Sequence, residues 1–234
     1  MGDTRANFYA GAGLDRLDKR RRDRAWIDAC LADPGTRFLP VWRGRNLVVN
    51  PERPSLAWLT AAEARHYLDR GAAWALLGLL EDCCYVALDV SEEEVPDHAP
   101  RLAGRGHFSD LRAVGPQLAR AEGSLLAYAR GLIYWHGRQR FCELCGSRTE
   151  AGQGGHVRRC RNAACGTQHF PRTDPAVIML IHDGGTRCVM GRQKLWPPGM
   201  HSTLAGFLEP GESLEEAVAR EVEEEVGLRV RDVA

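Results

Sequence analysis

The chain has 234 residues, of which 44% are hydrophobic and 26% are charged, proportions typical of a globular protein. Lysine plus arginine and aspartate plus glutamate number 31 each, so no overall charge attracts nucleic acid or a membrane, although a local basic groove stays possible. The N-terminus lacks the pattern of a secretory signal, and the longest apolar stretch, residues 72–80, is too short for a membrane span. We therefore expect a cytoplasmic protein without membrane segments, a setting in which disulfides are rare.

Residues 1–136 predict an N-terminal α+β domain. The expected helices and strands cover residues 15–31, 60–70 and 117–136 (helices) and 37–42, 46–49 and 85–90 (strands). Thr60 and Glu63 have the spacing of a capping box, which favours a helix start at this point. The basic run in the first helix is interleaved with aspartates, so it indicates a solvated helix face rather than a nucleic-acid tail.

Eight cysteines fall into two groups. Four lie in apolar surroundings without ligand spacing, and we expect them to be small buried hydrophobic side chains: Cys30, Cys83, Cys84 and Cys188. The other four form two pairs, with two residues inside the first, four inside the second and fourteen between the pairs: Cys142, Cys145, Cys160 and Cys165.

This spacing of the second group is typical of a structural zinc site. Two such pairs can place four thiolates tetrahedrally around the ion. Gly146 and Gly166 directly follow the second cysteine of each pair, where a tight turn needs a positive φ. We predict a small zinc ribbon over residues 137–172. His156 and His169 could replace a ligand, but four thiolates already complete the coordination shell.

Residues 173–234 predict a third unit. We expect a strand over 175–183, a turn at Asp183-Gly184-Gly185 and a hairpin partner over 187–193. A loop follows at 195–200, then a strand entering a turn over 202–210, a helix over 213–227 and a short final strand over 228–234. Ser213 with Glu216 predicts a capping box, and Gly227 predicts the helix stop.

The helix of this third unit is the most informative segment. At about 100° per residue, one apolar arc contains Leu214, Val218, Val222 and Val226, with Ala217 beside it. Glu221 and Glu225 project onto this arc, and Glu224 flanks them, whereas Glu216 and Glu223 project to solvent. Because a buried unpaired charge is prohibitive, Glu221 and Glu225, four residues apart, are expected to converge on one hard cation.

Clustered glutamates of this kind suit the hydrolysis of a diphosphate linkage. Bound magnesium or manganese neutralises the two negative charges and orients or ionises the attacking water. A nearby carboxylate can accept the water's proton. Arg220 can hold a glutamate through a bidentate contact, and the glycines between Gly206 and Gly211 let the backbone approach a ligand closely.

The pattern resembles the Nudix box of a large hydrolase family. That box fixes a glycine, a glutamate, an arginine–glutamate pair, two further glutamates, a glycine and two aliphatic positions. Every fixed position is satisfied within residues 206–228. They are Gly206, Glu212, Arg220, Glu221, Val222, Glu224, Glu225, Gly227 and Leu228.

A zinc ribbon directly ahead of the box makes the chain similar to the NAD(H) pyrophosphatase branch of that family. Supporting phrases are ARGLIYWHGRQRFCELCG, HFPRTDPAVIML and LAGFLEPGES, together with LDR and TRFLPVWRGRNLV nearer the N-terminus. The resemblance implies an N-terminal pyrophosphatase-like domain, the ribbon and a Nudix α/β/α sandwich over residues 173–234. It also implies a homodimer that cleaves NADH or NAD⁺ to nicotinamide mononucleotide (NMN) and AMP, and removal of NAD caps from RNA.

The resemblance also implies roles for particular residues. The Mg²⁺ or Mn²⁺ ligands would be Glu221, Glu225 and the backbone carbonyl of Ala205, and the catalytic set would add Glu212, Arg220 and Glu224. Phe170, usually tyrosine in the family, and Phe207 would pack on the nucleotide, with ordinary core packing as the equal alternative.

The end of the chain departs from the family pattern. The family continues with a proline-, tryptophan- and serine-containing signature, SQPWPFPxS, further strands, a closing helix and another metal-binding glutamate. None of these precedes Ala234, which follows Gly227 by seven residues, so we expect the sequence to be a fragment with an incomplete sandwich.

Two alternative functions remain open at this point. The box supplies a metal site and no base recognition, so a Nudix hydrolase of ADP-ribose or another nucleoside diphosphate conjugate is possible. The second alternative is a truncated, inactive zinc-ribbon module that binds nucleic acid or a protein through basic side chains around Cys160: Arg158, Arg159 and Arg161.

Overall fold

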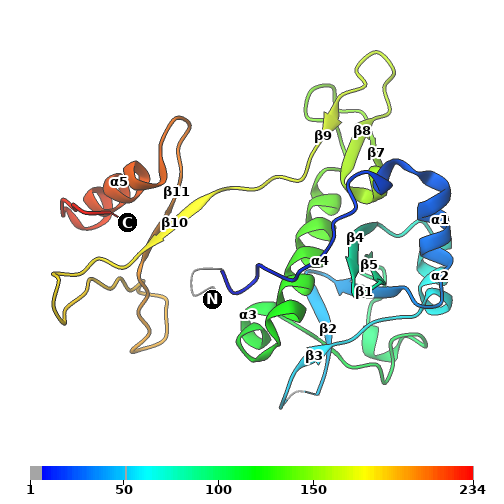
Figure 1. Cartoon of the computed structure of the whole chain (residues 1–234), viewed down its shortest axis with the longest axis horizontal. Coiled ribbons are helices and arrows are strands. Elements are labelled where there is room, and N and C mark those ends of the chain that lie inside the picture. Colours follow the sequence, from blue (N-terminus) through cyan, green and yellow to red (C-terminus); the bar gives the residue numbers. More distant parts are fainter. Residues whose placement is uncertain (1–6, 51, 234) are drawn as a thin grey trace. The chain divides into compact units, whose positions relative to one another are not determined.

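The computed structural model describes residues 7–50 and 52–233 and divides the chain into two compact units. Unit 1 covers Met1–Pro171 and unit 2 covers Arg172–Ala234. Both units contain helices and strands, so the mixed α+β class predicted from the sequence is confirmed (Figure 1). The finer boundary between residues 136 and 137 stays a prediction.

A mixed sheet forms the centre of unit 1. Its strand order is β3-β2-β1-β5-β4, and β6 also pairs with β2. The pairing of β1 with β5 is parallel, and the remaining pairings are antiparallel. The strands are β1 (Arg37–Trp42), β2 (Arg45–Val49), β3 (Ser55–Leu56), β4 (Trp74–Leu80), β5 (Cys83–Asp89) and β6 (His107–Ser109).

Helices cover both faces of this sheet (Figure 1). On one face, α4 packs leucines and alanines against inward-facing residues such as Leu39 and Leu77. On the other, α2 contributes Ala64 and Tyr67 to a cluster with Phe38 and other strand residues. The helices are η1 (Arg20–Arg22), α1 (Arg24–Ala32), α2 (Ala61–Asp69), η2 (Pro96–His98), α3 (Leu111–Val114), η3 (Gly115–Gln117) and α4 (Arg120–Arg138).

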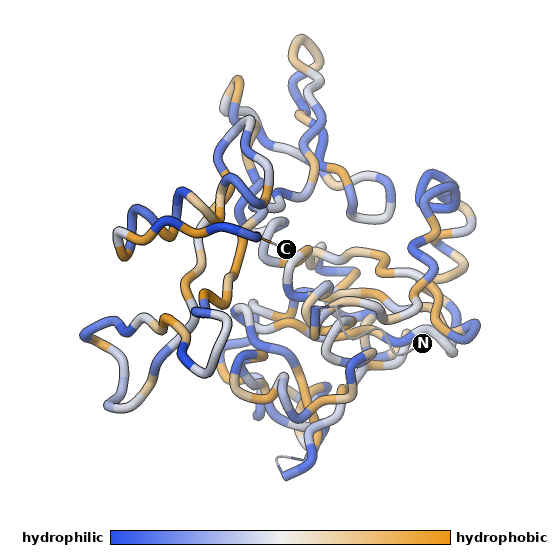
Figure 2. Tube along the Cα trace, turned by 60° about the vertical axis from the view of Figure 1, so that its left-hand side comes forward, coloured by the Kyte–Doolittle hydropathy of each residue, from blue (hydrophilic) through white to orange (hydrophobic). Residues whose placement is uncertain are grey.

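The two faces explain why the strands are apolar on consecutive positions. Phe38 points to one helix layer and Leu39 to the other, and both side chains are fully buried. Full burial of one such side chain stabilises the fold by about 1.5–3 kcal/mol. Figure 2 accordingly shows much of the hydrophobic colouring along the strands of this sheet.

Two predictions for unit 1 need correction. The helix expected over 15–31 begins only at Arg24, because Asp23 caps it by accepting a hydrogen bond from the Trp26 N–H. Before that point Asp15 is extended and bridges Leu79. Strand β4 was missed, since its seven residues are continuously apolar and show no alternation.

A small three-stranded sheet, β7-β8-β9, follows α4 and belongs to unit 1. Its elements are β7 (Thr149–Gly152), η4 (Gln153–Gly155), β8 (Val157–Cys160) and β9 (Gln168–His169). The η4 turn packs directly on β4: a Cβ atom at Gly155, whose φ is +87°, would lie 2.7 Å from the Ala75 Cα. Only glycine permits this close approach.

Two buried histidines fasten this small sheet to its surroundings. His136 Nε2 hydrogen-bonds the Gly155 carbonyl at 2.8 Å, and its Nδ1 accepts from Arg158 Nη1 at 2.9 Å. His156 Nε2 donates to the Leu76 carbonyl at 2.6 Å. Burial lowers the pKa of both histidines to about 4, because the charged ring would lose its hydration.

We expect unit 1 to lose stability as the pH falls from about 6.5 towards 4. The unfolded histidines bind protons in this window while the folded ones do not, so protonation favours the unfolded state, and the stability is fully present only above about 6.5. Thermal melts from pH 7.5 to 5 should show a falling Tm, with a shallower slope for His156→Gln than for a His201→Gln control, an exposed position in unit 2. A Tm that is constant across this range would contradict the prediction.

In its described residues, unit 2 contains one two-stranded sheet and one helix. Strands β10 (Ala176–Met179) and β11 (Leu204–Phe207) pair antiparallel, and α5 (Leu214–Val226) packs on them. Its core contains Val177, Met179, Leu204, Ala217 and Val222. The capping box predicted for this helix and its glycine stop are both confirmed, with Gly227 at φ +68°.

Three expectations for unit 2 are wrong. The partner of β10 is β11, whereas residues 187–193 contribute only isolated bridges such as His182–Cys188. Residues 228–233 form no strand. The apolar arc of α5 is only partly buried: Ala217 and Val222 are covered, but Leu214 is 56% exposed, because the two strands cover the middle of the helix and not its ends.

Of the four cysteines outside the paired set, three are less buried than the sequence predicted. Cys84 is buried as predicted, whereas Cys30 and Cys83 are half-buried. Cys188 is exposed, because it lies at the bridge beside the 183–185 turn and not in a strand. In the described part of the chain, no helix combines the length and apolar character needed to cross a membrane.

Candidate metal sites

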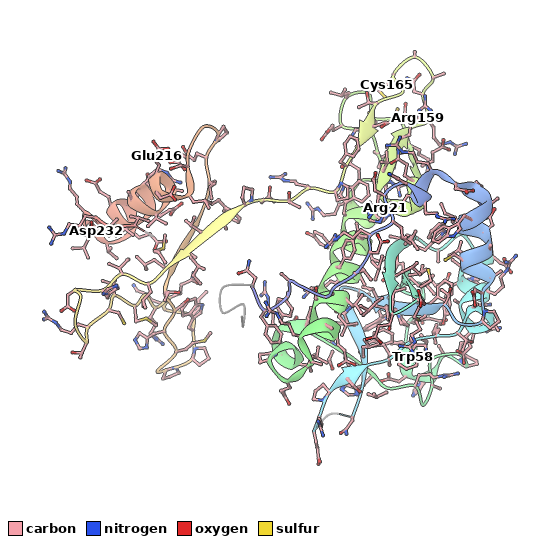
Figure 3. All side chains as sticks on the ribbon, in the orientation of Figure 1. Arg21, Trp58, Arg159, Cys165, Glu216 and Asp232 are labelled. Carbon is pink, nitrogen blue, oxygen red and sulfur yellow. The ribbon has the colours of Figure 1, made fainter. Side chains whose placement is uncertain are left out.

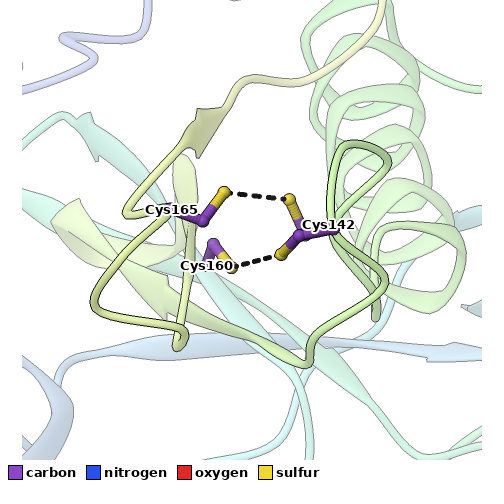
Figure 4. Close-up of side chains that lie close together, drawn as sticks. Cys142, Cys160 and Cys165 are labelled. Carbon is purple, nitrogen blue, oxygen red and sulfur yellow. Dashed lines mark hydrogen bonds between the residues drawn. The ribbon is translucent and has the colours of Figure 1, made fainter.

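The four paired cysteines come together at the β7-β8-β9 sheet. Their sulfur atoms all lie within 4.8 Å of one another, and Figure 4 shows the labelled Cys142, Cys160 and Cys165 close together. The Cys142 and Cys165 sulfurs are 3.8 Å apart, and those of Cys145 and Cys160 are 3.4 Å apart. Such a group of four sulfurs fits a closed, tetrahedral structural metal site.

Local backbone geometry builds this cluster. Gly146 and Gly166, at φ +70° and +59°, follow the second cysteine of each pair, as predicted. Hydrogen bonds from Ser147 lower the pKa of Cys145 to about 6 and bonds from Thr167 lower the pKa of Cys165, which favours their thiolates. Burial raises the pKa of Cys160 to about 12, so this cysteine needs the bound metal to lose its proton. Figure 3 labels Arg159, which lies in β8, and Cys165, which lies in the loop after this strand.

The two histidines weighed as alternative ligands lie outside the cluster. His156 donates to a backbone carbonyl, as described above, and His169 Nδ1 is 3.3 Å from Glu143 Oε1. The donor set is therefore four sulfurs.

The basic side chains beside Cys160 are partly committed to internal contacts. Arg158 donates from Nε to Thr149 Oγ1 at 2.8 Å and from Nη1 to His136. Arg161 lies 3.8 Å from Glu150. This reduces the basic surface that a nucleic-acid-binding ribbon would need.

A second candidate site lies in unit 2, where α5 meets β11. Gly206 is placed under the carboxylate of Glu221, whose side chain is 15% exposed. A Cβ atom at position 206 would overlap the Glu221 carboxyl group, so any larger residue there would have to displace this carboxylate. The close approach fixes this carboxylate against the strand backbone.

Arg220 holds the acidic side chains of the site. Its Nε and Nη2 donate to the two oxygens of Glu212 at 2.6 and 3.0 Å, a bidentate pair. Its Nη1 donates to Glu221 at 2.9 Å and to Glu224 at 3.0 Å. Its Nη2 also donates to the Phe207 carbonyl at 2.9 Å, which ties the helix to the end of β11.

These contacts have electrostatic consequences. The Arg220 guanidinium and then the Glu209 N–H lower the pKa of Glu212 to about 2, so this carboxylate stays ionised. The same carboxylates raise the pKa of Arg220 above its ordinary value. Both groups therefore carry their charges at neutral pH.

Glu225 and Ala205 lie together in a groove of about 490 Å³. Other lining residues include Gln193, Trp196 and Leu204. The volume lies within the range of small-molecule sites. Sequence reasoning missed this groove because residues 195–200 were interpreted only as a loop, although a tryptophan between exposed loop residues is a usable signal.

The predicted site residues are only partly brought together. Glu212, Glu221 and Glu224 share Arg220, whereas Glu225 is exposed rather than buried on the core side of the helix. Among the described residues, the α5 glutamates do not form a group of three with all oxygens within 4.8 Å. The donors are all oxygens, namely carboxylates and the backbone of Ala205, and this chemistry fits a hard divalent cation.

The two aromatic candidates are exposed. Phe207 is 66% exposed on unit 2, and Phe170 is 63% exposed at the end of unit 1. Neither ring is therefore packed in the core, which was the alternative for each, and both side chains are accessible from solvent.

We expect Arg220→Lys to lower the kcat of the diphosphate hydrolysis expected from the sequence by about 10- to 100-fold. A lysine ammonium cannot reproduce the bidentate contact with Glu212 together with the three hydrogen bonds to Glu221, Glu224 and the Phe207 carbonyl. Arg229→Lys is the matched control, since Arg229 makes a single 3.3 Å contact with Glu223 on the same helix. Steady-state kinetics of both variants in the complete protein test this. Equal activity of the two variants would contradict a positioning role for Arg220.

Comparison with known proteins shows the family to which this chain belongs. Residues 172–234 match the NUDIX domain, and residues 35–135 match the NADH pyrophosphatase-like rudimentary NUDIX domain. The chain is 36% identical over 236 residues to NAD-capped RNA hydrolase NudC of Mycobacterium tuberculosis, covering 94% of this chain and 67% of that protein. It is 48% identical over 124 residues to NAD-capped RNA hydrolase NUDT12 of Homo sapiens, covering 50% of this chain.

The match covers only 27% of the length of human NUDT12, and likewise 27% of the Macaca fascicularis protein of that name, which is 48% identical. The chain belongs to the Nudix family, in the group that carries an NADH pyrophosphatase-like domain ahead of the Nudix domain.

Proposed function

We propose that this protein hydrolyses the diphosphate linkage of NADH or NAD⁺ to NMN(H) and AMP, with a divalent cation, and also removes NAD caps from RNA. The observation that carries the proposal is the joint placement of Ala205 and Glu225 in one groove, beside a Glu221 carboxylate held against Gly206. The relatives named NAD-capped RNA hydrolases support the choice of substrate.

Mg²⁺ or Mn²⁺ held by Glu221, Glu225 and the Ala205 carbonyl would neutralise the diphosphate and activate water. The chain's own residues do the remaining work. Arg220 fixes Glu221 and Glu224 in place, and Glu212 in turn fixes Arg220 through the bidentate pair. Glu224, 59% exposed and 3.0 Å from Arg220, is suited to accept the proton of the attacking water.

We further propose that the four-cysteine cluster holds a structural zinc ion. Four sulfurs complete a tetrahedral shell and leave no open position for water, so this site takes no part in hydrolysis. The homodimer implied by the family resemblance stays a prediction, and light scattering on the protein tests it. The cytoplasmic location expected from the sequence also stays a prediction.

In this proposal Trp196 provides a stacking face for one half of the dinucleotide. The groove places it in the same cavity as Ala205 and Glu225, and its loop is braced because Arg192 Nη2 donates to the Trp196 carbonyl at 2.7 Å. Stacking on an aromatic side chain contributes about 1–3 kcal/mol to the binding free energy of a base. Phe207, exposed on the neighbouring strand, is available for the other half.

We expect Trp196→Ala to raise the KM for NADH about tenfold with little change in kcat, and Trp196→Phe to restore most of the affinity. Leu195→Ala is the control, because Leu195 is 95% exposed. An unchanged KM for Trp196→Ala would remove Trp196 from the substrate site.

The experiment that tests the proposed function is product analysis with NADH, NAD⁺ and ADP-ribose under identical conditions. The proposal predicts AMP and NMN(H) from the first two, with ADP-ribose cleaved much more slowly. Faster cleavage of ADP-ribose would favour the alternative Nudix substrate, and no cleavage of any would contradict the proposal. An NAD-capped RNA, compared with its triphosphate form, tests the decapping activity in the same assay.

A further inference from the structure

Cys30 and Cys84 bring two thiol groups together inside unit 1. Cys30 lies in α1 and Cys84 in β5, separated by 54 residues, yet their sulfur atoms are 2.9 Å apart. This distance is shorter than the 3.4 and 3.8 Å that separate sulfur pairs within the four-cysteine cluster. Two sulfurs this close need only small rotations to reach bonding distance, about 2.05 Å.

The surroundings favour a sulfur–sulfur bond over metal binding. Cys84 belongs to the apolar cluster of buried side chains that includes Phe38 and Leu76, and the half-buried Cys30 packs against this cluster. In the described part of the chain, neither belongs to a group of three or more metal-ligating side chains. A disulfide replaces two polar thiols with an apolar bridge, which suits this environment.

The two thiols differ in access to solvent. Cys84 is 6% exposed, and Cys30 is half-buried. Burial raises the pKa of both thiols, so little thiolate is present at neutral pH and the reaction with oxidants is slow. Cys30 is the sulfur that a small oxidant reaches first.

We propose that Cys30 and Cys84 are an oxidation site that forms an intramolecular disulfide when the protein meets a peroxide. The Cys30 thiolate attacks one peroxide oxygen, the O–O bond breaks, and Cys30 becomes a sulfenic acid while the other oxygen leaves as water or an alcohol. The Cys84 sulfur then attacks the Cys30 sulfur and water leaves with the Cys84 proton. The two sulfurs together lose two electrons, which the peroxide gains.

The bridge would tether α1 to the central sheet. It closes a loop of about 55 residues, and disulfides closing loops of this size stabilise mainly by restricting the unfolded chain. We expect a rise in the Tm of unit 1 of about 5–10 °C. The bridge uses no residue of the four-cysteine cluster or of the α5 site, so the proposal does not rest on the proposed function.

The test is non-reducing peptide mapping of the zinc-loaded protein after treatment with one equivalent of hydrogen peroxide, with zinc content and Tm measured on the same samples. We expect a linked Cys30–Cys84 peptide two hydrogens lighter than its parts, retained zinc and the higher Tm. Cys30→Ser should abolish both the linked peptide and the Tm rise, whereas Cys188→Ser, at an exposed position, should keep both.

Recovery of Cys30 and Cys84 as separate alkylated or sulfinic peptides would overturn the proposal, as would pairing of Cys84 with another cysteine. Because Cys84 is buried, Cys30→Ser at the half-buried position carries the test even if Cys84→Ser does not fold.

Discussion

Replacing Glu225 with glutamine is expected to lower the turnover of NADH at least a hundredfold while folding and zinc content stay intact. Glutamine keeps the shape of the side chain and removes the charge that a hard cation requires. Glu225 is exposed, lines the groove with Ala205, and makes no hydrogen bond or ion pair with any described residue. Its replacement by glutamine therefore removes no hydrogen bond or ion pair among the described residues.

Glu223→Gln is the matched control for this experiment. It lies on the same helix, is exposed, and pairs only with Arg229 at 3.3 Å, so its activity should equal that of the unmodified protein. Steady-state kinetics and the Tm of both variants in the complete protein provide the measurement. Unchanged turnover in Glu225→Gln would show that Glu225 does not hold the catalytic cation.

Replacing Cys145 with serine is expected to lower zinc content and thermal stability together. Structural zinc sites contribute about 10–16 kcal/mol of apparent binding free energy, which is also folding free energy. The small sheet around this site packs through η4 and the His156–Leu76 bond onto β4, so its loss should also lower the Tm of unit 1.

Zinc stoichiometry by elemental analysis and Tm by calorimetry measure this effect. Cys188→Ser is the control, since that cysteine is exposed and stands outside the cluster. If Cys145→Ser keeps one zinc ion per chain, the four-sulfur site is not the zinc site.

Local signals in the sequence predicted much of this structure. The Thr60–Glu63 and Ser213–Glu216 capping boxes form as expected, because they satisfy backbone N–H groups within a few residues. The left-handed glycine at Gly227 and the turns of the cysteine pairs are equally local. Strand β1 has the predicted limits, Arg37–Trp42.

The sequence-based predictions failed where contacts between residues distant in the sequence determine the secondary structure or the strand pairing. The partner of β10 is β11, which begins 25 residues after β10 ends, and nothing in the local pattern favours it over residues 187–193. Strand β4 carries no alternation, because both faces of the sheet are covered. Asp23 sets the start of α1 by capping, and of the described charged residues before it only Arg20–Arg22 form a short helical turn, η1.

In the candidate site of unit 2, too, some features could be predicted from the local sequence and others depend on the folded chain. Helical projection placed Glu221 correctly near the core, and the structure adds that its carboxylate lies directly against Gly206, where a larger residue would displace it. Projection failed for Glu225, because the two-stranded sheet does not cover the end of α5. The alternating hydrophobic and hydrophilic turns of that helix in Figure 2 show its amphipathic character but not how far it is covered. The groove around Trp196 required the folded chain, since its walls come from separate segments.

The central claim is that a divalent cation bound at Ala205, Glu221 and Glu225 enables this chain to cleave a diphosphate linkage. The most direct test is NADH turnover in the complete protein after removal of weakly bound cations by EDTA, under conditions in which elemental analysis still finds one zinc ion per chain. The account predicts no turnover in the chelated protein and recovery of AMP and NMNH when Mg²⁺ or Mn²⁺ is added, but not in Glu225→Gln. Full turnover without added cation, or none with it, would contradict the account.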